Sequence, residues 1–315
     1  MSQDESSWVM ERITALRSQN RLRNTVALDP IGPSEVHRDG RPVLLFSAND
    51  YLGLSTHEQV RQAASEAAQR YGMGPRGATL VCGHTHIHAE LETALAELKQ
   101  TETALLFPSG YQANVGLLSA LGTPDTTIFS DALNHASIID GCRLARARIS
   151  VFDHADAEDL KRQLLACSSA RKIVVTDEVF SMDGDHAPLR AIAELKARHN
   201  FTWVTDSAHS TLVFGPNGGG LAEAAGVSSV IDYQVGTLSK AIGAQGGFVA
   251  TSHTNRSWLL NSARSFVFST ALPIPVLAAA RAALSAAGDG VLRETLWRNI
   301  RYLSTGLDAE LSGPI

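Results

Sequence analysis

Cysteine, net positive charge and long apolar runs are all scarce in this chain, and each shortage excludes a class of protein. The 315 residues include three scattered cysteines, Cys82, Cys142 and Cys167, which form no CxxC pair. We therefore expect no zinc site and a reducing compartment. The formal net charge of −5 argues against nucleic acid as the main partner. No apolar run approaches the ~18 residues that a transmembrane helix needs, so we expect no membrane partner.

The first residues do not have the pattern of a secretory signal. Met1-Ser2-Gln3-Asp4-Glu5 is acidic and lacks a basic region followed by an apolar stretch. We therefore expect a cytoplasmic protein. An organelle stays open, because a C-terminal targeting signal would lie beyond Ile315.

Seven short apolar runs alternate with helical stretches along most of the chain. Strands that alternate with helices are typical of a mostly parallel sheet with both faces covered. The sequence therefore predicts an α/β fold with a mostly parallel seven-stranded sheet and helices on both faces. The runs are residues 104–107, 127–130, 149–152, 172–176, 202–205, 232–236 and 247–250.

Flanking segments complete the expected organisation. Apolar residues from Trp8 to Leu16 recur at helical spacing and predict an amphipathic helix over about residues 7–22. Other expected elements are a strand over 43–46 and helices over 58–70, 87–99, 274–287 and 290–311. The expected domains are an N-terminal helix and arm (1–50), a large domain (51–288) and a linking helix (289–315).

The last predicted helix has an apolar stripe, formed by Leu292, Leu296, Ile300, Leu303 and Leu307. Such a stripe needs an apolar surface to pack on. The following Gly-Pro pair at 313–314 is typical of a turn into a further strand. We expect that a small C-terminal domain is largely missing from this chain and that the stripe is exposed without it.

Lys240 is the most informative residue, because an acid and an imidazole precede it at the end of another strand. The apolar run over 202–205 is followed by Asp206 and His209, and Lys240 comes just past the run over 232–236. In an open α/β sheet, such strand ends face one crevice where ligands bind. A lysine beside an aspartate suits pyridoxal phosphate. The amine forms a Schiff base with the aldehyde, and the carboxylate keeps the pyridine nitrogen protonated.

Two other patterns are weaker signals. The run Gly72-x-Gly74-x-x-Gly77 has the letters of the dinucleotide-binding fingerprint, but it follows a predicted helix and contains Pro75. We expect a glycine-rich loop near the substrate instead. The alternating His84, His86 and His88 could be metal ligands, yet no carboxylate or cysteine completes the set at short range in the sequence. We therefore expect no metal site.

Four motifs in a fixed order resemble a known family. The family is the α-oxoamine synthases, pyridoxal-phosphate enzymes of fold type I that join an amino acid to an acyl-CoA and release carbon dioxide. The resemblance covers residues 8–311 and implies pyridoxal phosphate as cofactor, a homodimer, and a further domain with the arginine that binds the amino-acid carboxylate. The motifs are Asn49-Asp50-Tyr51-Leu52-Gly53-Leu54, Ser130-Asp131-Ala132-Leu133-Asn134-His135-Ala136-Ser137, Val179-Phe180-Ser181-Met182-Asp183-Gly184-Asp185 and Gly236-Thr237-Leu238-Ser239-Lys240-Ala241.

The resemblance implies a catalytic role for four residues. Lys240 would hold the cofactor and remove the α-proton of the amino acid. Asp206 would pair with the pyridine nitrogen, and His209 with the phenolic oxygen of the cofactor. His135 would stack on the pyridine ring and assist proton transfer. One departure is Ser207, which stands where the family commonly has a second acid, and we expect adjusted surroundings rather than lost chemistry.

Further positions follow from the same resemblance. They are Gly110, Tyr111 and Thr237 at the phosphate, Thr270 at the phosphate across a dimer interface, Glu178 and Ser181 near the cofactor ring, and Arg23 and Asn49 near the substrates. Exposed N–H groups at a helix N-terminus independently suit a phosphate at Gly110. From the residues alone, Arg23 also fits a solvated basic helix end, and Thr270 an ordinary strand end.

The substrate follows from one stretch of the sequence. Residues 181–189 are most similar to the members that make 8-amino-7-oxononanoate from L-alanine and pimeloyl-CoA, and residues 72–77 and 264–273 resemble their plant-type versions. Two alternatives share much of the site: a 2-amino-3-ketobutyrate CoA ligase that uses glycine and acetyl-CoA, and serine palmitoyltransferase-like chemistry. An alternative of another class is a non-catalytic fragment that binds the cofactor or dimerises with a full-length chain.

Overall fold

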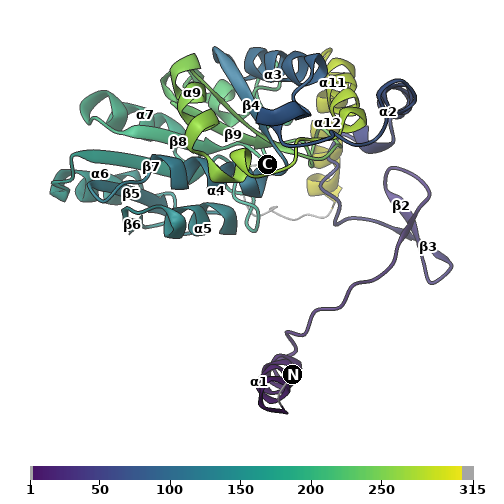
Figure 1. The fold of residues 1–315 in the computed structure, drawn as a ribbon, viewed down its shortest axis with the longest axis horizontal. Coiled ribbons are helices and arrows are strands. Elements are labelled where there is room, and N and C mark those ends of the chain that lie inside the picture. Colours follow the sequence, from purple (N-terminus) through teal and green to yellow (C-terminus); the bar gives the residue numbers. More distant parts are fainter. Residues whose placement is uncertain (1–2, 307–315) are drawn as a thin grey trace. The chain divides into compact units, whose positions relative to one another are not determined.

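The computed structural model describes residues 3–306, which divide into two units between Ser47 and Ala48 (Figure 1). The first unit contains α1 (Gln3–Ser18), β1 (Asp29–Pro30), β2 (Glu35–Arg38) and β3 (Arg41–Leu44). Its strands form an antiparallel sheet in the order β1-β2-β3. Asp39 and Gly40 connect β2 to β3 with φ angles of 52° and 74°. Two positive φ angles are the conformation that favours Asp-Gly in two-residue hairpins.

Element boundaries in the first unit differ from the predicted ones. α1 ends at Ser18, so Arg21 and Arg23 follow the helix rather than forming its basic end. The strand predicted over 43–46 begins and ends two residues earlier, as β3. β1 and β2 are not predicted, because Val36 is the one apolar side chain that they bury.

Within residues 48–306, the second unit forms a seven-stranded sheet in the order β4-β10-β9-β8-β7-β5-β6. β10 runs antiparallel to β4 and β9, and the remaining pairs are parallel. The predicted fold class is therefore confirmed, and each of the seven runs is a strand with both ends within one residue of the prediction. The strands are β4 (Thr103–Phe107), β5 (Thr126–Asp131), β6 (Arg148–Phe152), β7 (Arg171–Asp177), β8 (Thr202–Asp206), β9 (Tyr233–Thr237) and β10 (Gly247–Thr251).

The helices of the second unit connect and cover these strands. They are α2 (Glu58–Tyr71), α3 (His86–Lys99), α4 (Gly110–Leu121), α5 (Ala136–Leu144), α6 (Ala157–Ala166), α7 (Leu189–Arg198), α8 (Leu221–Ala225), α9 (His253–Ser262), α10 (Arg264–Val267), α11 (Ile274–Ala286) and α12 (Val291–Gly306). The predictions for α2, α3 and α11 are confirmed. Within residues 3–306 no single helix is long and apolar enough to cross a membrane, although α11 and α12 meet that measure as a pair bent by 73°.

Apolar side chains alternate between the two faces of the sheet. In β4, Ala104 and Leu106 pack with residues of α2, α3 and α11, whereas Leu105 and Phe107 pack with residues of α4 and α9. In β7, Val174 packs with α6 and α7. Figure 1 shows α3 and α11 near the β4 end of the sheet and α6 and α7 toward the other end. Burial on both faces explains why the strands read as nearly continuous apolar runs.

The predicted apolar stripe of α12 finds part of its packing surface inside the second unit. Leu292 and Leu296 pack against the core cluster that contains α3 and α11. The indole of Trp297 packs there too and donates a hydrogen bond to the Val213 carbonyl at 2.9 Å. Leu303 is 46% exposed. The expectation of a wholly exposed stripe is therefore wrong for its first half. Residues from 307 on, including the predicted Gly-Pro turn, lie outside the described residues.

A buried cation, Lys99, holds the chain that follows β8. Its side chain is 1% exposed, and its Nζ donates to Ser207 Oγ and Thr211 Oγ1, each at 2.8 Å, and to the Gly219 carbonyl at 2.7 Å. Burial lowers the pKa of Lys99 to about 8, against the attraction of the Glu178 carboxylate. A loop of more than ten residues is thus anchored by one side chain at the end of α3.

Lys99→Met should lower the free energy of unfolding by about 3 kcal/mol, because it leaves the buried acceptors and a nearby carboxylate without their cation. Urea unfolding followed by circular dichroism measures the change. Lys161→Met is the matched control, since the Lys161 side chain is partly exposed and pairs with Glu158 at 2.9 Å on the surface; its cost should stay below about 0.5 kcal/mol. Equal stabilities for the two variants would contradict the anchoring role of Lys99.

Candidate active site

Parallel strands end side by side at one edge of the sheet, and their last residues are polar. β7 ends at Asp177, β8 at Asp206 and β9 at Thr237. The register places Asp177 opposite Asp206, and both are buried. Since the chain leaves every one of these strands at the same edge, the residues that follow build one crevice.

Lys240, His209 and Tyr51 form a chain of hydrogen bonds in this crevice. Lys240 Nζ lies 2.6 Å from His209 Nε2, and His209 Nδ1 lies 2.7 Å from the Tyr51 hydroxyl. Tyr51 in turn donates to Asn49 Oδ1 at 3.3 Å. Because its own proton goes to Asn49, Tyr51 accepts the proton of Nδ1, and Nε2 is left to accept from Lys240. The neutral imidazole of His209 therefore orients the Lys240 amine through this hydrogen bond.

The pKa shifts of this chain share one main cause, which is burial. Burial lowers the pKa of His209 to about 4, and the Lys240 charge acts in the same direction. Burial also raises the pKa of Tyr51 to about 12. The pKa of Lys240 is lowered by burial, although Asp206 and Asp177 oppose that shift. Near neutral pH the imidazole and the phenol are thus uncharged, and the amine gives up its proton more readily than an exposed lysine.

Asp206 is the charged member of a buried carboxyl pair. Its Oδ2 accepts from Asn114 Nδ2 at 2.6 Å, and its Oδ1 accepts from the Ala208 amide at 2.9 Å. Burial and the Asp206 charge raise the pKa of Asp177 well above its ordinary value. Two adjacent buried carboxyls do not both ionise readily; the two donors at Asp206 favour its charged form, and Asp177 is the member whose pKa is raised.

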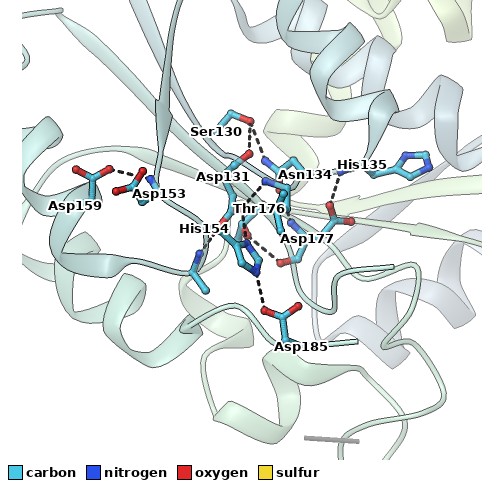
Figure 2. A network of polar contacts seen from close by, with 12 residues as sticks. Ser130, Asp131, Asn134, His135, Asp153, His154, Asp159, Thr176, Asp177 and Asp185 are labelled. Atoms are coloured by element: carbon cyan, nitrogen blue, oxygen red, sulfur yellow. Dashed lines mark hydrogen bonds and ion pairs between the residues drawn. The ribbon is translucent and has the colours of Figure 1, made fainter. Parts of the chain in front are cut away.

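His135 lies on the turn between β5 and α5, next to this pair. Its backbone amide donates to Asp177 Oδ2 at 2.7 Å, and its Nδ1 lies 2.7 Å from Ser137 Oγ. Its side chain is exposed, and Figure 2 shows the ring pointing away from Asp177. The backbone of His135 is thus fixed to the carboxyl pair, and its imidazole is free to meet a ligand.

The N-terminus of α4 packs tightly against the end of β9. A Cβ on Gly110 would lie 3.2 Å from Thr237 Cβ, which only a glycine avoids without a shift. By helix geometry, the N–H groups of Gly110 and Tyr111 have no intrahelical acceptor. The Thr237 hydroxyl lies 2.8 Å from Ser239 Oγ nearby. Free N–H groups at a helix N-terminus beside two hydroxyls are suited to a phosphate.

Glu178 faces a different part of the fold than the resemblance implies. Its side chain is fully buried, and its carboxylate accepts from Thr205 Oγ1 and the Leu221 amide, each at 3.0 Å, and from the Ser210 hydroxyl. These partners lie in β8, in the turn that follows it and at the start of α8. The carboxylate therefore fastens those elements together and is not hydrogen-bonded to the Lys240 chain.

The other predicted residues lie in separate places. Ser181 is exposed and lines the same cavity as His209. Thr270 is exposed and forms an isolated antiparallel bridge with Ala78. Arg23 is exposed in the first unit, and its role near a substrate stays a prediction.

A cavity of about 340 Å³ opens beside His209. Its polar lining comes from Tyr51, Ser181 and His209. The remaining lining is apolar and is provided by Val179, Phe180, Gly184, Val213, Phe214, Leu296 and Ile300. A space that is polar at the lysine end and apolar elsewhere suits a substrate with an aliphatic chain.

The alternating histidines have structural contacts. His88 is buried, and its Nδ1 accepts from the Thr85 amide at 3.2 Å, which caps α3. His84 Nε2 lies 3.4 Å from Glu92, a carboxylate that the sequence spacing did not suggest. Within residues 3–306, no group of three or more His, Cys, Asp or Glu side chains is arranged to hold a metal ion.

Four site residues received no role from the sequence: Tyr51, Asp177, Asn114 and Lys99. Tyr51 lies in the Asn49–Leu54 motif, which could have pointed to it. The sequence could have suggested Asp177, because it lies in the acidic segment Thr-Asp-Glu at the end of an apolar run. In the sheet this position is paired with Asp206. Asn114 gives no sequence signal, since it is one of several polar residues on its helix, together with Gln112 and Ser119. Lys99 likewise looks like an ordinary basic residue in the last turn of a helix.

Comparison with known proteins places this arrangement in a family. The model of the aminotransferase class I and II family matches residues 41–313. The 8-amino-7-oxononanoate synthase of Lysinibacillus sphaericus is 48% identical over 277 residues, which are 87% of this chain and 71% of that protein. The Arabidopsis thaliana enzyme of the same name is 44% identical over 299 residues, which are 88% of this chain and 63% of that protein.

A solved structure agrees with these sequence matches. Serine palmitoyltransferase from S. paucimobilis, with a bound PLP-myriocin aldimine, superposes with a TM-score of 0.89 at 33% identity, over 97% of this chain and 78% of that one. The chain therefore belongs to the aminotransferase class I and II family, in the branch that contains the 8-amino-7-oxononanoate synthases.

Proposed function

We propose that this protein is a pyridoxal-phosphate-dependent acyltransferase of biotin biosynthesis. It condenses L-alanine with pimeloyl-CoA, or a pimeloyl-carrier thioester, to 8-amino-7-oxononanoate, with release of CoA and carbon dioxide. The observation that carries the proposal is the Lys240–His209–Tyr51 chain beside the buried Asp206. The choice of substrates is supported by 44–48% identity to 8-amino-7-oxononanoate synthases of several organisms.

The residues of the site fit pyridoxal phosphate at each of its polar groups. The N-terminus of α4 and the hydroxyls of Thr237 and Ser239 would hold the phosphate. Asp206 would pair with the pyridine nitrogen, and the Lys240 amine would bind the aldehyde. When bound, the cofactor supplies an electron sink for the negative charge that develops at the α-carbon of the amino acid.

Lys240 is the base of the proposed reaction. Burial lowers its pKa, which increases the fraction of free amine near neutral pH. The acceptor nitrogen of His209, 2.6 Å away, orients the amine. Lys240 can therefore accept the α-proton at Nζ from an amino acid bound in the crevice.

The hydrogen-bond donors around Asp206 favour the charged form of its carboxylate. Asn114 and the Ala208 amide both donate to its carboxylate. The pKa of the neighbouring Asp177 is raised by burial and by the Asp206 charge, which reduces the repulsion between the two carboxyls. A fixed buried anion stabilises a protonated pyridine nitrogen more strongly than an exposed one would.

The remaining predicted roles are part of this proposal. The exposed His135 ring would lie over the cofactor ring, and Ser181 and Asn49 would border the substrates. We also propose a homodimer in which Thr270 of one protomer reaches the phosphate bound by its partner. The exposed side chain of Thr270 allows such a contact.

Lys240→Ala should abolish covalent attachment of the cofactor and lower the condensation rate by at least ~10³-fold, because it removes both the amine and the base. Borohydride reduction of the protein with pyridoxal phosphate, followed by peptide mass spectrometry, should modify Lys240 in the wild type. Lys161→Ala is the control and should behave as the wild type. A condensation rate of Lys240→Ala equal to that of the wild type would contradict the proposal.

Asp206→Asn should lower kcat by roughly 10²–10³-fold at saturating cofactor, because it keeps the shape of the side chain but removes the charge on which the electron sink depends. Steady-state kinetics with L-alanine and pimeloyl-CoA measures the effect. Asp125→Asn, in an exposed turn, serves as the control. A kcat within twofold of the wild type would show that Asp206 does not act on the cofactor.

A panel of amino acids and thioesters should single out one pair. L-alanine with pimeloyl-CoA should give the highest kcat/KM. Glycine with acetyl-CoA and L-serine with palmitoyl-CoA should each be at least ~10-fold poorer, the scale of discrimination that a few methylenes provide. A preference for either of those pairs would assign the chain to a sister reaction, and cofactor binding without any turnover would favour the non-catalytic alternative.

A further inference from the structure

Asp131, His154 and Asp185 form a hydrogen-bonded bridge at the same edge of the sheet (Figure 2). His154 Nδ1 lies 2.9 Å from Asp131 Oδ1, and His154 Nε2 lies 2.6 Å from Asp185 Oδ2. His154 follows the edge strand β6, whereas Asp131 ends β5. The imidazole therefore joins two carboxylates that belong to separate loops.

Asp131 is the fixed end of this bridge. Its side chain is buried, and besides His154 it accepts from the backbone amides of Leu133 at 2.9 Å and Ala155 at 2.8 Å. The His154 ring packs edge-on against Phe180, with the ring centroids 4.4 Å apart. One nitrogen of the imidazole is thus held by a rigid anchor, and its ring plane is set by an aromatic neighbour.

Asp185 is the other end of the bridge, and it closes the turn over residues 180–185. The Phe180 amide donates to the Asp185 carbonyl at 3.0 Å, and the Gly184 amide to the Phe180 carbonyl at 2.9 Å. Gly184 has φ of 73°, which favours glycine. Phe180, Ser181 and Gly184 from this turn line the cavity beside His209. Among the described residues, the other Asp185 oxygen is buried without a partner. The turn is therefore tied to β5 through His154.

The loop at the opposite end of the bridge carries His135. The Leu133 amide binds Asp131, and Asn134 Oδ1 accepts from the Asp177 amide at 2.9 Å. The His135 amide then binds the Asp177 carboxyl. The bridge thus fixes the cavity turn relative to the loop that presents His135.

The titratable groups that face His154 are the two carboxylates of the bridge. Asp159 of α6 is directed to the Asp153 amide and to Arg162. His186 packs against Phe214. Burial by itself would lower the pKa of His154, but the hydrogen bonds to Asp131 and Asp185 outweigh it, and the pKa lies above its ordinary value.

We propose that His154 is a positioning residue for the condensation, which holds the cavity turn over residues 180–185 in register with the loop of His135. The inference rests on the proposed function. His154 touches neither substrate nor cofactor, and it acts through Asp185 on the wall of the cavity that receives the acyl chain. Its substitution therefore changes substrate binding more than the chemical step.

The direction of the pH dependence follows from the charge. A histidine whose folded-state pKa is raised stabilises the folded arrangement at low pH, and this contribution is lost as pH rises through the folded-state pKa. The turn is thus held most firmly while His154 is an imidazolium between two carboxylates. KM for the acyl thioester should rise as pH increases through the His154 pKa.

The test compares His154→Gln and Asp185→Asn with the exposed control His253→Gln. Glutamine can reach Asp185 but carries no charge, so KM for pimeloyl-CoA should rise roughly tenfold, with kcat changed less than about twofold. The rise of KM with pH should disappear in His154→Gln. In Asp185→Asn the rise of KM should occur at lower pH, because the imidazolium loses one of its two anionic partners.

Hydrogen exchange gives a readout that does not depend on catalysis. At one fixed pH, amides over residues 180–186 should exchange faster in both bridge variants than in His253→Gln. If the wild type proves inactive, the proposed function fails, and faster exchange still supports the bridge. Unchanged exchange in both variants, or an unchanged KM and pH profile in an active enzyme, overturns the inference.

Discussion

The structure depends on one electrostatic constraint, a pair of carboxyls buried side by side at the ends of β7 and β8. Register forces Asp177 and Asp206 together, and low dielectric surroundings forbid two adjacent charges. Burial and the Asp206 charge raise the pKa of Asp177, which makes its protonated form easier to reach and eases the conflict. Asn114 then selects Asp206 as the anion. A buried negative charge of fixed position, near a lysine with a lowered pKa, is the feature that the proposed chemistry needs.

Loops at this edge are held by side chains that lie outside the crevice. Lys99 reaches from α3 to the chain after β8, which carries His209. His154 reaches from β6 to the turn that carries Ser181. Both use buried or half-buried charge, which is costly to desolvate and is tolerated where it is fully hydrogen-bonded. The strands determine where the acidic residues lie, and the hydrogen bonds of Lys99 and His154 hold the loops that follow the strands.

Burial explains how much of this the sequence reveals. The strands of the large sheet other than β6 are buried on both faces, so their positions stand out as apolar runs, whereas the exposed β1 and β2 leave no such pattern. Asp206, His209 and Lys240 could be placed because each follows a run. Asn114 and Lys99 could not, since their partners lie 92 and 108 residues away in the chain. Glu178 matches a position of the family, and its carboxylate accepts a hydrogen bond from the start of α8. The direction of its side chain depends on packing, which the spacing of residues in the sequence does not show.

The visible absorbance spectrum of the purified chain with pyridoxal phosphate tests the central claim most directly. The account predicts a protein-bound cofactor band that shifts when L-alanine is added and changes again with pimeloyl-CoA. Glycine or L-serine should shift the band less at the same concentration. A cofactor band that forms at Lys240 but does not shift when any of the amino acids is added would contradict the claim that this site carries out the condensation.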